Sequence, residues 1–205
     1  ATGMIYLLAR PSAGGGTSRL LLVGIAIGAG FAALTGFFTF AADDDELQSV
    51  VFWQMGSLGA ITWLKLAIAV VPVAAGVGLL ILLARRLDLL TLGERQAKHL
   101  GLDVERTRRT VIVTTALLTG ASVAFAGTIG FIGLVVPHIV RLVCGPAHRS
   151  LLPVSAVIGA LLIVVADTLS RIVAPPAEVP IGLFTALMGA PFFLMLVMRS
   201  RAVHG

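Results

Sequence analysis

Two ionisable residues lie within a long apolar stretch of the sequence, where a charged side chain is costly and often functional. Asp167 and Arg171 both fall in residues 151–172, one helical turn apart, so they can pair on a single helix. A carboxylate in such a place can act as a proton site. It can also be a structural partner for the arginine, and we expect this second role because Asp167 lies near the outer end of the segment.

Other residues with catalytic or metal-binding chemistry are few. Cys144 is the single cysteine, so it forms no disulfide within the chain and lacks the paired spacing of a metal site. We expect His138 and Arg141 to mark the inner end of a short apolar segment rather than to bind a metal or heme. The sequence contains no phosphate-binding loop and no nucleophile beside a base. We therefore expect no catalytic residues, no metal site and no cofactor.

A compact polar segment, TLGERQAKHLGLDVERTRR at residues 91–109, separates two apolar runs and holds eight charged residues. Thr91 and Glu94 have the spacing of a capping box, which predicts the start of a helix. Gly101 is well placed as the left-handed residue that ends this helix. Asp103 can then cap a second helix that leads into the next apolar run. The segment is predicted to be two helices hinged at the glycine.

Such a helix pair has two possible uses, and the pattern alone leaves both open. Its basic residues can interact with lipid headgroups and anchor a loop at a membrane surface. Alternatively, the pair can dock into a cleft on a cytoplasmic protein.

The composition of the whole chain places these groups in a membrane protein. The 205 residues are 58% hydrophobic and 12% charged, and their mean hydropathy is +1.02. A soluble domain carries about 25% charged residues, so an ordinary soluble fold is excluded. The formal charge of +5 comes from short clusters between apolar runs, which argues against a nucleic-acid-binding face. We expect an all-α, polytopic helix bundle.

Six membrane spans are predicted, since about 20 residues cross the hydrocarbon core. The sixth, residues 128–145, is interrupted by polar residues and is expected to be short and bent at Pro137. If it spans, thirteen of the fifteen Lys and Arg residues share one side, as the positive-inside rule favours. The C-terminus and loop 85–109 are then cytoplasmic. The other five spans are residues 20–40, 66–84, 111–126, 151–172 and 181–198.

The chain is expected to be a single transmembrane domain, residues 1–205, with a second polar insertion on the outer side. Residues 41–63 contain Asp43 followed by Glu46, again the spacing of a capping box, and then apolar residues at helical spacing. This pattern predicts a short extracytoplasmic helix. Residues 1–10 look like the tail of a helix whose beginning is absent.

Four longer motifs resemble one transporter family. They stand in the order that is typical of FecCD-type permeases, the membrane subunits of bacterial ABC importers for iron-siderophores, heme and vitamin B12. The resemblance covers nearly the whole chain from Thr17 onward. The motifs are LGERQAKHLG, VAFAGTIGFIGLVVPHIVRLVCGPAHRSLLP, ADTLSR and EVPIGLFTALMGAPFFL.

The resemblance implies a ten-span permease, of which this chain corresponds to the last six spans and a remnant of the fourth. Such permeases work as homodimers, or with a homologous permease, in the bacterial cell membrane. They sit on two ATP-hydrolysing subunits and receive substrate from an extracytoplasmic binding protein. The permease itself is not an enzyme. The outer segment ADDDELQSVVFWQMGSLG looks most like the heme branch, with siderophore next and vitamin B12 third.

The resemblance also implies roles for two groups of cytoplasmic residues. Glu94, Ala97 and Gly101 match the coupling helices that sit in a groove of the ATPase, where the two small residues allow close approach. Thr17 and Ser18, in TSRLLL, match part of the cytoplasmic gate. These last two can also serve simply as helix caps.

On the outer side, Arg171 matches a rim residue that pairs with a carboxylate of the binding protein. The alternative is a local pair with Asp167. Both pairings can hold in turn, because the guanidinium of an arginine can exchange one carboxylate partner for another. Two other function classes stay open for the chain. It can be a proton-coupled secondary transporter that uses Asp167, or a membrane assembly protein that transports nothing.

Overall fold

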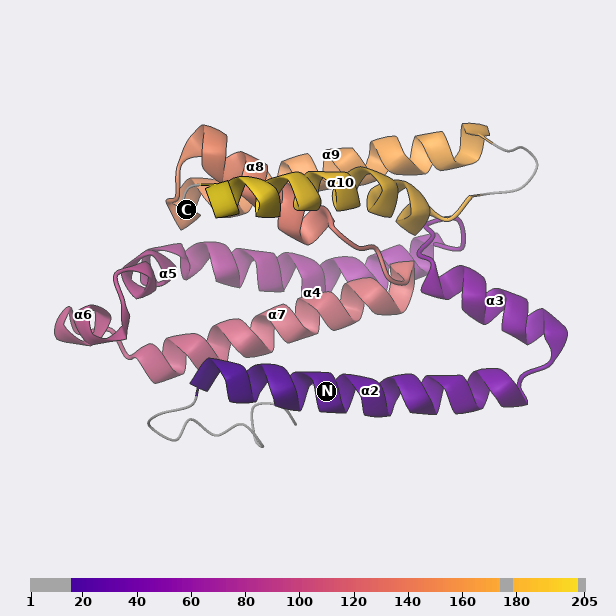
Figure 1. Ribbon diagram of the computed structural model, residues 1–205, viewed down its shortest axis with the longest axis horizontal. Coiled ribbons are helices and arrows are strands. Elements are labelled where there is room, and N and C mark those ends of the chain that lie inside the picture. Colours follow the sequence, from indigo (N-terminus) through magenta and orange to yellow (C-terminus); the bar gives the residue numbers. More distant parts are fainter. Residues whose placement is uncertain (1–15, 174–178, 203–205) are drawn as a thin grey trace. The chain divides into compact units, whose positions relative to one another are not determined.

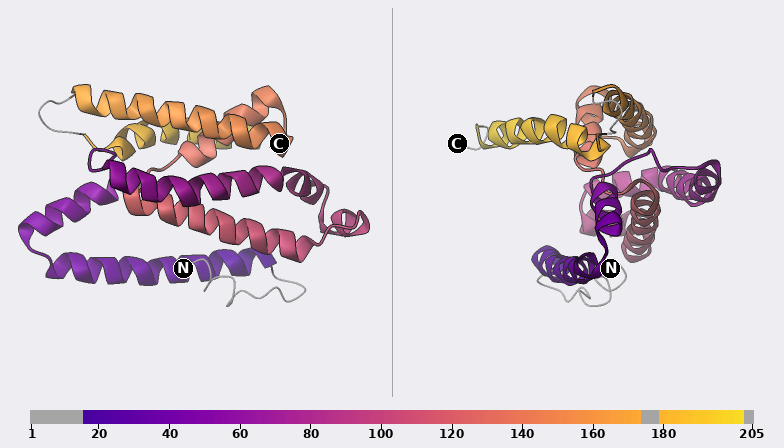
Figure 2. Two further views of the ribbon diagram at one scale, coloured as in Figure 1. Left: turned by 180° about the vertical axis from the view of Figure 1, so that it is seen from behind. Right: turned by 90° about the vertical axis from the view of Figure 1, so that its right-hand side faces the viewer.

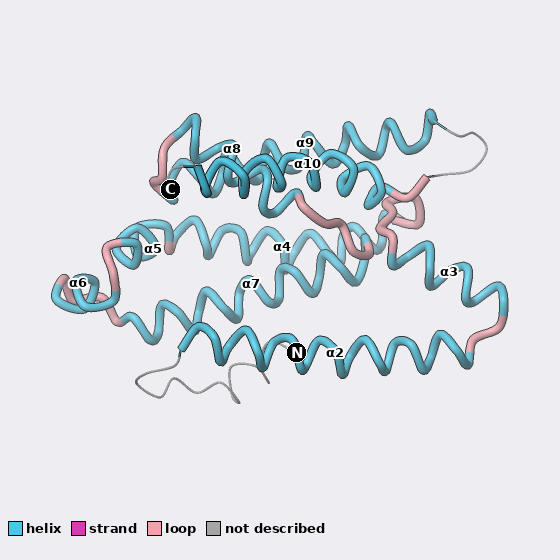
Figure 3. The backbone as a smooth tube through the Cα atoms, viewed as in Figure 1, coloured by secondary structure: helices cyan, strands magenta, loops and turns pink. Residues whose placement is uncertain are grey.

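The computed structural model describes residues 16–173 and 179–202, and every regular element in these ranges is a helix (Figures 1 and 3). Of residues 16–21, 196, 197 and 199–202 only the backbone is described. The chain divides into two compact units, one ending at Val51 and the other beginning at Phe52. The all-α class predicted from the sequence is confirmed.

The first unit contains a long apolar helix and most of a short polar one. Helix α2, Gly16–Ala41, includes the predicted span 20–40, and its 26 residues extend over about 39 Å. Helix α3, Asp44–Gln54, carries three acidic residues in its first turn, where they favourably oppose the helix dipole. Its first turn closes with a 2.8 Å hydrogen bond from Leu47 N–H to the carbonyl of Asp43. A short helix is thus present within residues 41–63, as the sequence predicts.

The second unit pairs long apolar helices. Helices α4 and α7 lie side by side and antiparallel (Figures 1 and 2), and a Cβ added to Gly76 of α4 would come within 2.7 Å of Leu118 Cδ2 of α7. Helices α8 and α9 pack through a small apolar core, and α10 contacts both. The elements are α4 (Trp63–Leu82), α5 (Ala84–Thr91), α6 (Glu94–His99), α7 (Val104–Ala126), α8 (Ile132–Cys144), α9 (His148–Val173) and α10 (Ile181–Ala202).

The predicted spans are recovered as helices of different lengths. Within the described residues, α2, α4, α7 and α9 are long and apolar enough to cross a membrane, whereas α8 and the Ile181–Met195 part of α10 are shorter. The 13 residues of α8 extend only about 20 Å, less than the roughly 30 Å of hydrocarbon. Pro137 lies inside this helix and does not end it.

One end of the second unit, which we call the rim end, is joined by backbone hydrogen bonds. They connect the residues after α3 with the C-terminus of α7 and the N-terminus of α10. Close approach requires glycine here, because a Cβ on Gly182 would lie 2.0 Å from the carbonyl oxygen of Met55. The bonds are Ser57 N–H to Ala126 O (3.0 Å), Ile181 N–H to Gly56 O (2.9 Å) and Gly182 N–H to Met55 O (3.1 Å).

The opposite end, the coupling end, contains α5, α6, the start of α7 and the turn between α8 and α9. The chain leaves α7 at the rim end and enters α9 at the coupling end, beside α5. Residues 128–147 therefore run from one end of the unit to the other, although α8 is short. This path agrees with the crossing that the sequence predicts for residues 128–145.

Basic residues are divided unequally between these two ends. Lys65 and Arg171 belong to the rim end, whereas all the other Lys and Arg residues between α4 and α9 belong to the coupling end. By the positive-inside rule, the coupling end is the expected cytoplasmic end. Its basic residues are Arg85, Arg86, Arg95, Lys98, Arg106, Arg108, Arg109, Arg141 and Arg149.

Candidate functional site

The polar segment at the coupling end, residues 85–109 and here called the coupling segment, is an ordered group of helices. Helix α5 continues from α4 after one residue, Leu83, and both Leu83 and Ala84 are buried. Helix α6 packs against α5 and α7 and protrudes at the end of the unit (Figure 1). The segment therefore has a fixed shape that a partner could grip.

Helix α6 ends in the way the sequence predicts. Gly101 has a φ of +81°, a left-handed conformation that strongly favours glycine. The N–H of Leu102 donates to the carbonyl of Ala97, and the N–H of Gly101 donates to that of Lys98, each at 3.0 Å. This bond pair is a Schellman motif and satisfies carbonyls that the helix end would leave open.

The start of α6 differs from the sequence prediction. Thr91 is the last residue of α5, and its hydroxyl donates to the carbonyl of Asp88 at 2.7 Å. Helix α6 begins at Glu94, after Gly93 turns the chain with a φ of +100°. The predicted Thr91–Glu94 capping box is therefore wrong, because the half-buried leucine face of α5 extends that helix through the threonine.

The prediction for Asp103 is confirmed, with one difference in the helix that it caps. Its Oδ1 accepts a 3.0 Å hydrogen bond from the N–H of Arg106. The capped helix is the long α7 itself, Val104–Ala126, and no separate short helix precedes it.

Two of the predicted coupling residues, Glu94 and Ala97, lie on α6 and the third, Gly101, just follows it, but the three differ in accessibility. Ala97 has 0% of its surface exposed, so it packs inside the segment, where a larger side chain would not fit. Glu94 and Gly101 are exposed. The carboxylate of Glu94 is ion-paired with Arg108 of α7, and Arg108 also lies 3.9 Å from a carboxylate oxygen of Glu105. The pairing fixes α6 on α7.

A further polar pair in this region was missed by the sequence analysis. The Oδ1 of Asp88 on α5 accepts a hydrogen bond from the backbone N–H of His148 at 2.8 Å and lies 2.7 Å from its Nδ1. These bonds, with the charges of His148 and Arg149, lower the pKa of the Asp88 carboxyl, and partial burial opposes the shift. The sequence holds one indication of this contact. The residue before α9 is Ala147, whose side chain cannot cap a helix, so a capping group has to come from elsewhere in the chain.

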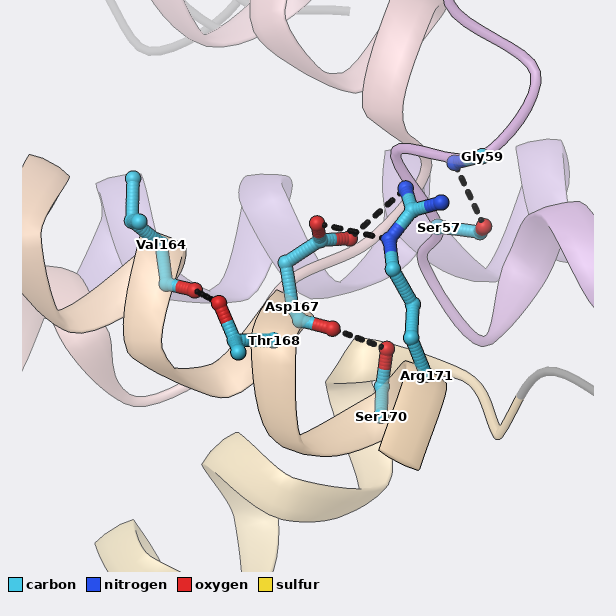
Figure 4. Close-up of polar contacts among 7 residues, drawn as sticks. All are labelled: Ser57, Gly59, Val164, Asp167, Thr168, Ser170 and Arg171. Atoms are coloured by element: carbon cyan, nitrogen blue, oxygen red, sulfur yellow. Dashed lines mark hydrogen bonds and ion pairs between the residues drawn. The ribbon is translucent and has the colours of Figure 1, made fainter. Parts of the chain in front are cut away.

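At the rim end, Arg171 folds back along its own helix onto Asp167 (Figure 4). The Nε–Oδ2 distance is 2.9 Å and the Nη2–Oδ1 distance is 3.3 Å, so the arginine fork binds both carboxylate oxygens. The Arg171 side chain is 46% exposed and that of Asp167 23%. The local pair expected from the sequence is present, and the guanidinium stays accessible from outside.

The predicted gate residues Thr17 and Ser18 lie in the first turn of α2, and their side chains are outside the described residues. His138 stacks edge-on against Phe192 of α10, with ring centroids 6.2 Å apart. Within the described part of the chain, no group of three or more His, Cys, Asp or Glu side chains is arranged to hold a metal.

One strained residue was not predicted. Phe131, the N-cap of α8, has a φ of +65°, which is rare for a bulky residue. Its Cβ lies so near Gly189 of α10 that a Cβ added to the glycine would be 2.2 Å away. Both residues line an apolar cavity of about 230 Å³ between α8, α9 and α10.

Comparison with known proteins places this arrangement in a family. Residues 1–199 match the FecCD transport family. The chain is 46% identical over 187 residues to the hemin transport system permease protein HmuU of Yersinia pestis, covering 91% of this chain and 56% of the relative. It is 45% identical over 186 residues to the vitamin B12 import system permease protein BtuC of Vibrio cholerae, with 90% and 55% covered.

Two further comparisons agree with these. The Fe(3+) dicitrate transport system permease protein FecD of Escherichia coli is 43% identical over 183 residues, covering 89% of this chain and 57% of the relative. A solved inward-facing structure of a metal-chelate type ABC transporter superposes with a TM-score of 0.88 at 36% identity, covering 97% of this chain and 63% of that one. The chain spans about half the length of the curated relatives it matches. By sequence and by structure, the chain belongs to the FecCD transport family.

Proposed function

We propose that this chain is the membrane-spanning part of a permease that imports a metal chelate, driven by ATP hydrolysis on a separate subunit. The observation that carries the proposal is the construction of α6. A single turn and a half of helix is buried at Ala97, ion-paired through Glu94 and closed by Gly101, while its other side chains stay exposed. A short rigid helix with an exposed face suits a groove on a partner protein.

The charge of the exposed face of α6 fits either role, and the packing of the segment separates them. Arg95, Lys98 and His99 are exposed around α6. A loop that only anchors to headgroups needs basic residues but no buried alanine and no Schellman motif. The ordered packing of the coupling segment therefore favours a mechanical role over a lipid anchor.

The substrate is proposed as a class, with heme placed first. The relatives named for hemin, vitamin B12 and ferric dicitrate transport are 46%, 45% and 43% identical to this chain, so overall similarity does not rank them. The outer segment at residues 42–59 favours heme, then a ferric siderophore, then vitamin B12.

The partners follow from the same proposal. We expect two ATP-binding cassette subunits at the coupling end, and a second permease copy or a homologous permease beside this one. We expect an extracytoplasmic binding protein at the rim end, where the exposed guanidinium of Arg171 can exchange Asp167 for a carboxylate of the partner. Thr17 and Ser18 are proposed gate residues, and the location is a bacterial cell membrane.

The test is uptake by the purified complex in proteoliposomes. The permease is isolated with whatever ATPase subunit copurifies, and uptake of hemin, ferrichrome and cyanocobalamin is measured with and without ATP. Gly101→Pro should abolish ATPase copurification and uptake, because proline does not adopt the left-handed conformation at this turn. Lys65→Ala, at the opposite end, is the matched control and should leave both unchanged.

The proton-coupled alternative predicts the reverse pattern. If Asp167 is the proton site, Asp167→Asn abolishes uptake while Gly101→Pro does not, and a proton gradient replaces ATP. The bidentate pair with Arg171 favours a structural carboxylate. A chain that carries none of the three chelates and binds no ATPase would instead fit the assembly-protein alternative.

A further inference from the structure

A polar contact between α5 and the start of α9 has no part in the function proposed above. One oxygen of the Asp88 carboxylate accepts the backbone N–H of His148 at 2.8 Å and lies 2.7 Å from the ring Nδ1 of that histidine. The two residues are sixty positions apart in the chain. Two bonds to one oxygen make the contact directional, so it fixes where α9 starts relative to α5.

Helix α9 depends on this contact for its cap. The first N–H groups of a helix lack partners within it, and a side-chain oxygen at the preceding residue usually supplies one. That residue is Ala147, whose carbonyl accepts the N–H groups of Ser150 and Leu151 but whose side chain accepts nothing. Asp88 supplies the missing carboxylate from another helix, and its charge also favours the positive helix N-terminus.

The contact joins two different mechanical parts. On one side, α5 belongs to the coupling segment and packs against α6 and α7. On the other, Leu151 lies one turn after His148 and is buried with Val136 and Val140 of α8. If α5 moves, one of two things must follow. Either the Asp88 contact breaks, or the start of α9 moves with α5 and α8 moves with α9.

We propose that Asp88 and His148 are positioning residues that transmit movement of the coupling segment to α8 and α9 during transport. This inference rests on the proposed function, because it requires an ATPase that moves the segment. Asp88 lies on α5 and contacts the first residue of α9. It acts by holding the N-terminus of a neighbouring helix.

The experiment separates transmission from simple helix capping. Asp88→Ala removes the contact. The double variant Asp88→Ala/Ala147→Asp returns a carboxylate to the N-cap of α9 but leaves α5 unlinked. Thr62→Ala is the control, since Thr62 caps α4 at the opposite, rim end of the unit. Uptake of hemin, ferrichrome and cyanocobalamin and ATP hydrolysis are measured for each complex in proteoliposomes, and the thermal midpoint in nanodiscs.

We expect Asp88→Ala to lower the chelate moved per ATP by about fivefold or more, as a coupling energy of roughly 1 kcal/mol implies. The double variant should recover the wild-type thermal midpoint, while the amount of chelate that it moves per ATP stays low. Thr62→Ala should keep the wild-type amount of chelate moved per ATP. If Asp88→Ala alone does not fold, the double variant is compared with wild type instead.

Three results would overturn the inference. The double variant could move as much chelate per ATP as wild type, which would mean that Asp88 only caps α9. Asp88→Ala could keep the wild-type amount of chelate moved per ATP, or Thr62→Ala could lose as much of it as Asp88→Ala. These outcomes all require a wild-type complex that transports. A wild-type complex that hydrolyses no ATP and moves none of the three chelates instead refutes the proposed function, and the inference with it.

Discussion

The carboxylate of Glu94 on α6 and the guanidinium of Arg108 on α7 form an ion pair between residues fourteen positions apart. The pair closes the hairpin that contains Gly101 and holds α6 against α7. Because both side chains are partly exposed, the pair is screened by solvent and its value lies in orientation more than in stability. A helix of six residues has little stability alone, so its contacts with its neighbours decide whether it forms.

Loss of this ion pair should loosen α6 without unfolding the protein. We expect Glu94→Gln to raise hydrogen exchange at the α6 amides by about two- to fivefold, as an exposed pair of 0.5–1 kcal/mol implies. Glu94→Gln/Arg108→Gln should raise exchange by less than the two single changes combined, and this difference is the coupling term of the double-mutant cycle. Glu105→Gln is the control, since its contact with Arg108 is longer at 3.9 Å. Equal effects from Glu94 and Glu105 would contradict the pairing.

Replacement of Gly101 should weaken the end of α6 because of its backbone conformation. At a φ of +81°, an alanine costs about 1–2 kcal/mol, and no neighbouring atom adds a steric penalty. We expect Gly101→Ala to lower ATPase binding and to expose the amides of Gly101 and Leu102 to exchange. Gly120→Ala, in open space inside α7, should leave both unchanged. An equal loss from the two variants would rule out the backbone explanation.

The features that the sequence predicted are those encoded locally. Apolar runs locate the long helices, and Gly101 and Asp103 occupy ends of helices where few residue types fit. The placement of Thr91 failed for a physical reason. Its local capping signal competes with the leucine face of α5, and burial of that face extends the helix through the threonine.

The features that were missed depend on distant residues. In the sequence, Asp88 is one acidic residue in a basic stretch, and only the fold places His148 beside it. Phe131 carries no sign of a left-handed backbone, because bulky residues rarely adopt it. Its close packing against Gly189 of α10 is likewise a contact between distant parts of the chain.

Close packing at Phe131 should make Gly189 sensitive to a single added methyl group. We expect Gly189→Ala to destabilise the protein by about 1–3 kcal/mol, because the crowding atom is a Cβ fixed to a strained backbone. Gly76→Ala meets the end of the Leu118 side chain, which can change rotamer, so its cost should be smaller. Thermal unfolding in nanodiscs measures both. A larger effect at Gly76 would show that Phe131 is free to move.

Acid should remove the stabilising contact of Asp88. Its pKa lies below the ordinary aspartate value because the hydrogen bonds and charge at His148 favour the carboxylate. A group with a depressed pKa in the folded state stabilises the protein above its unfolded pKa of about 4, and this stabilisation is lost as pH falls through the folded value. Wild type should therefore unfold at a higher temperature than Asp88→Asn near pH 6, and the difference should narrow below about pH 4. Thermal midpoints measured across this range for both proteins test the prediction, which fails if the difference stays constant or widens in acid.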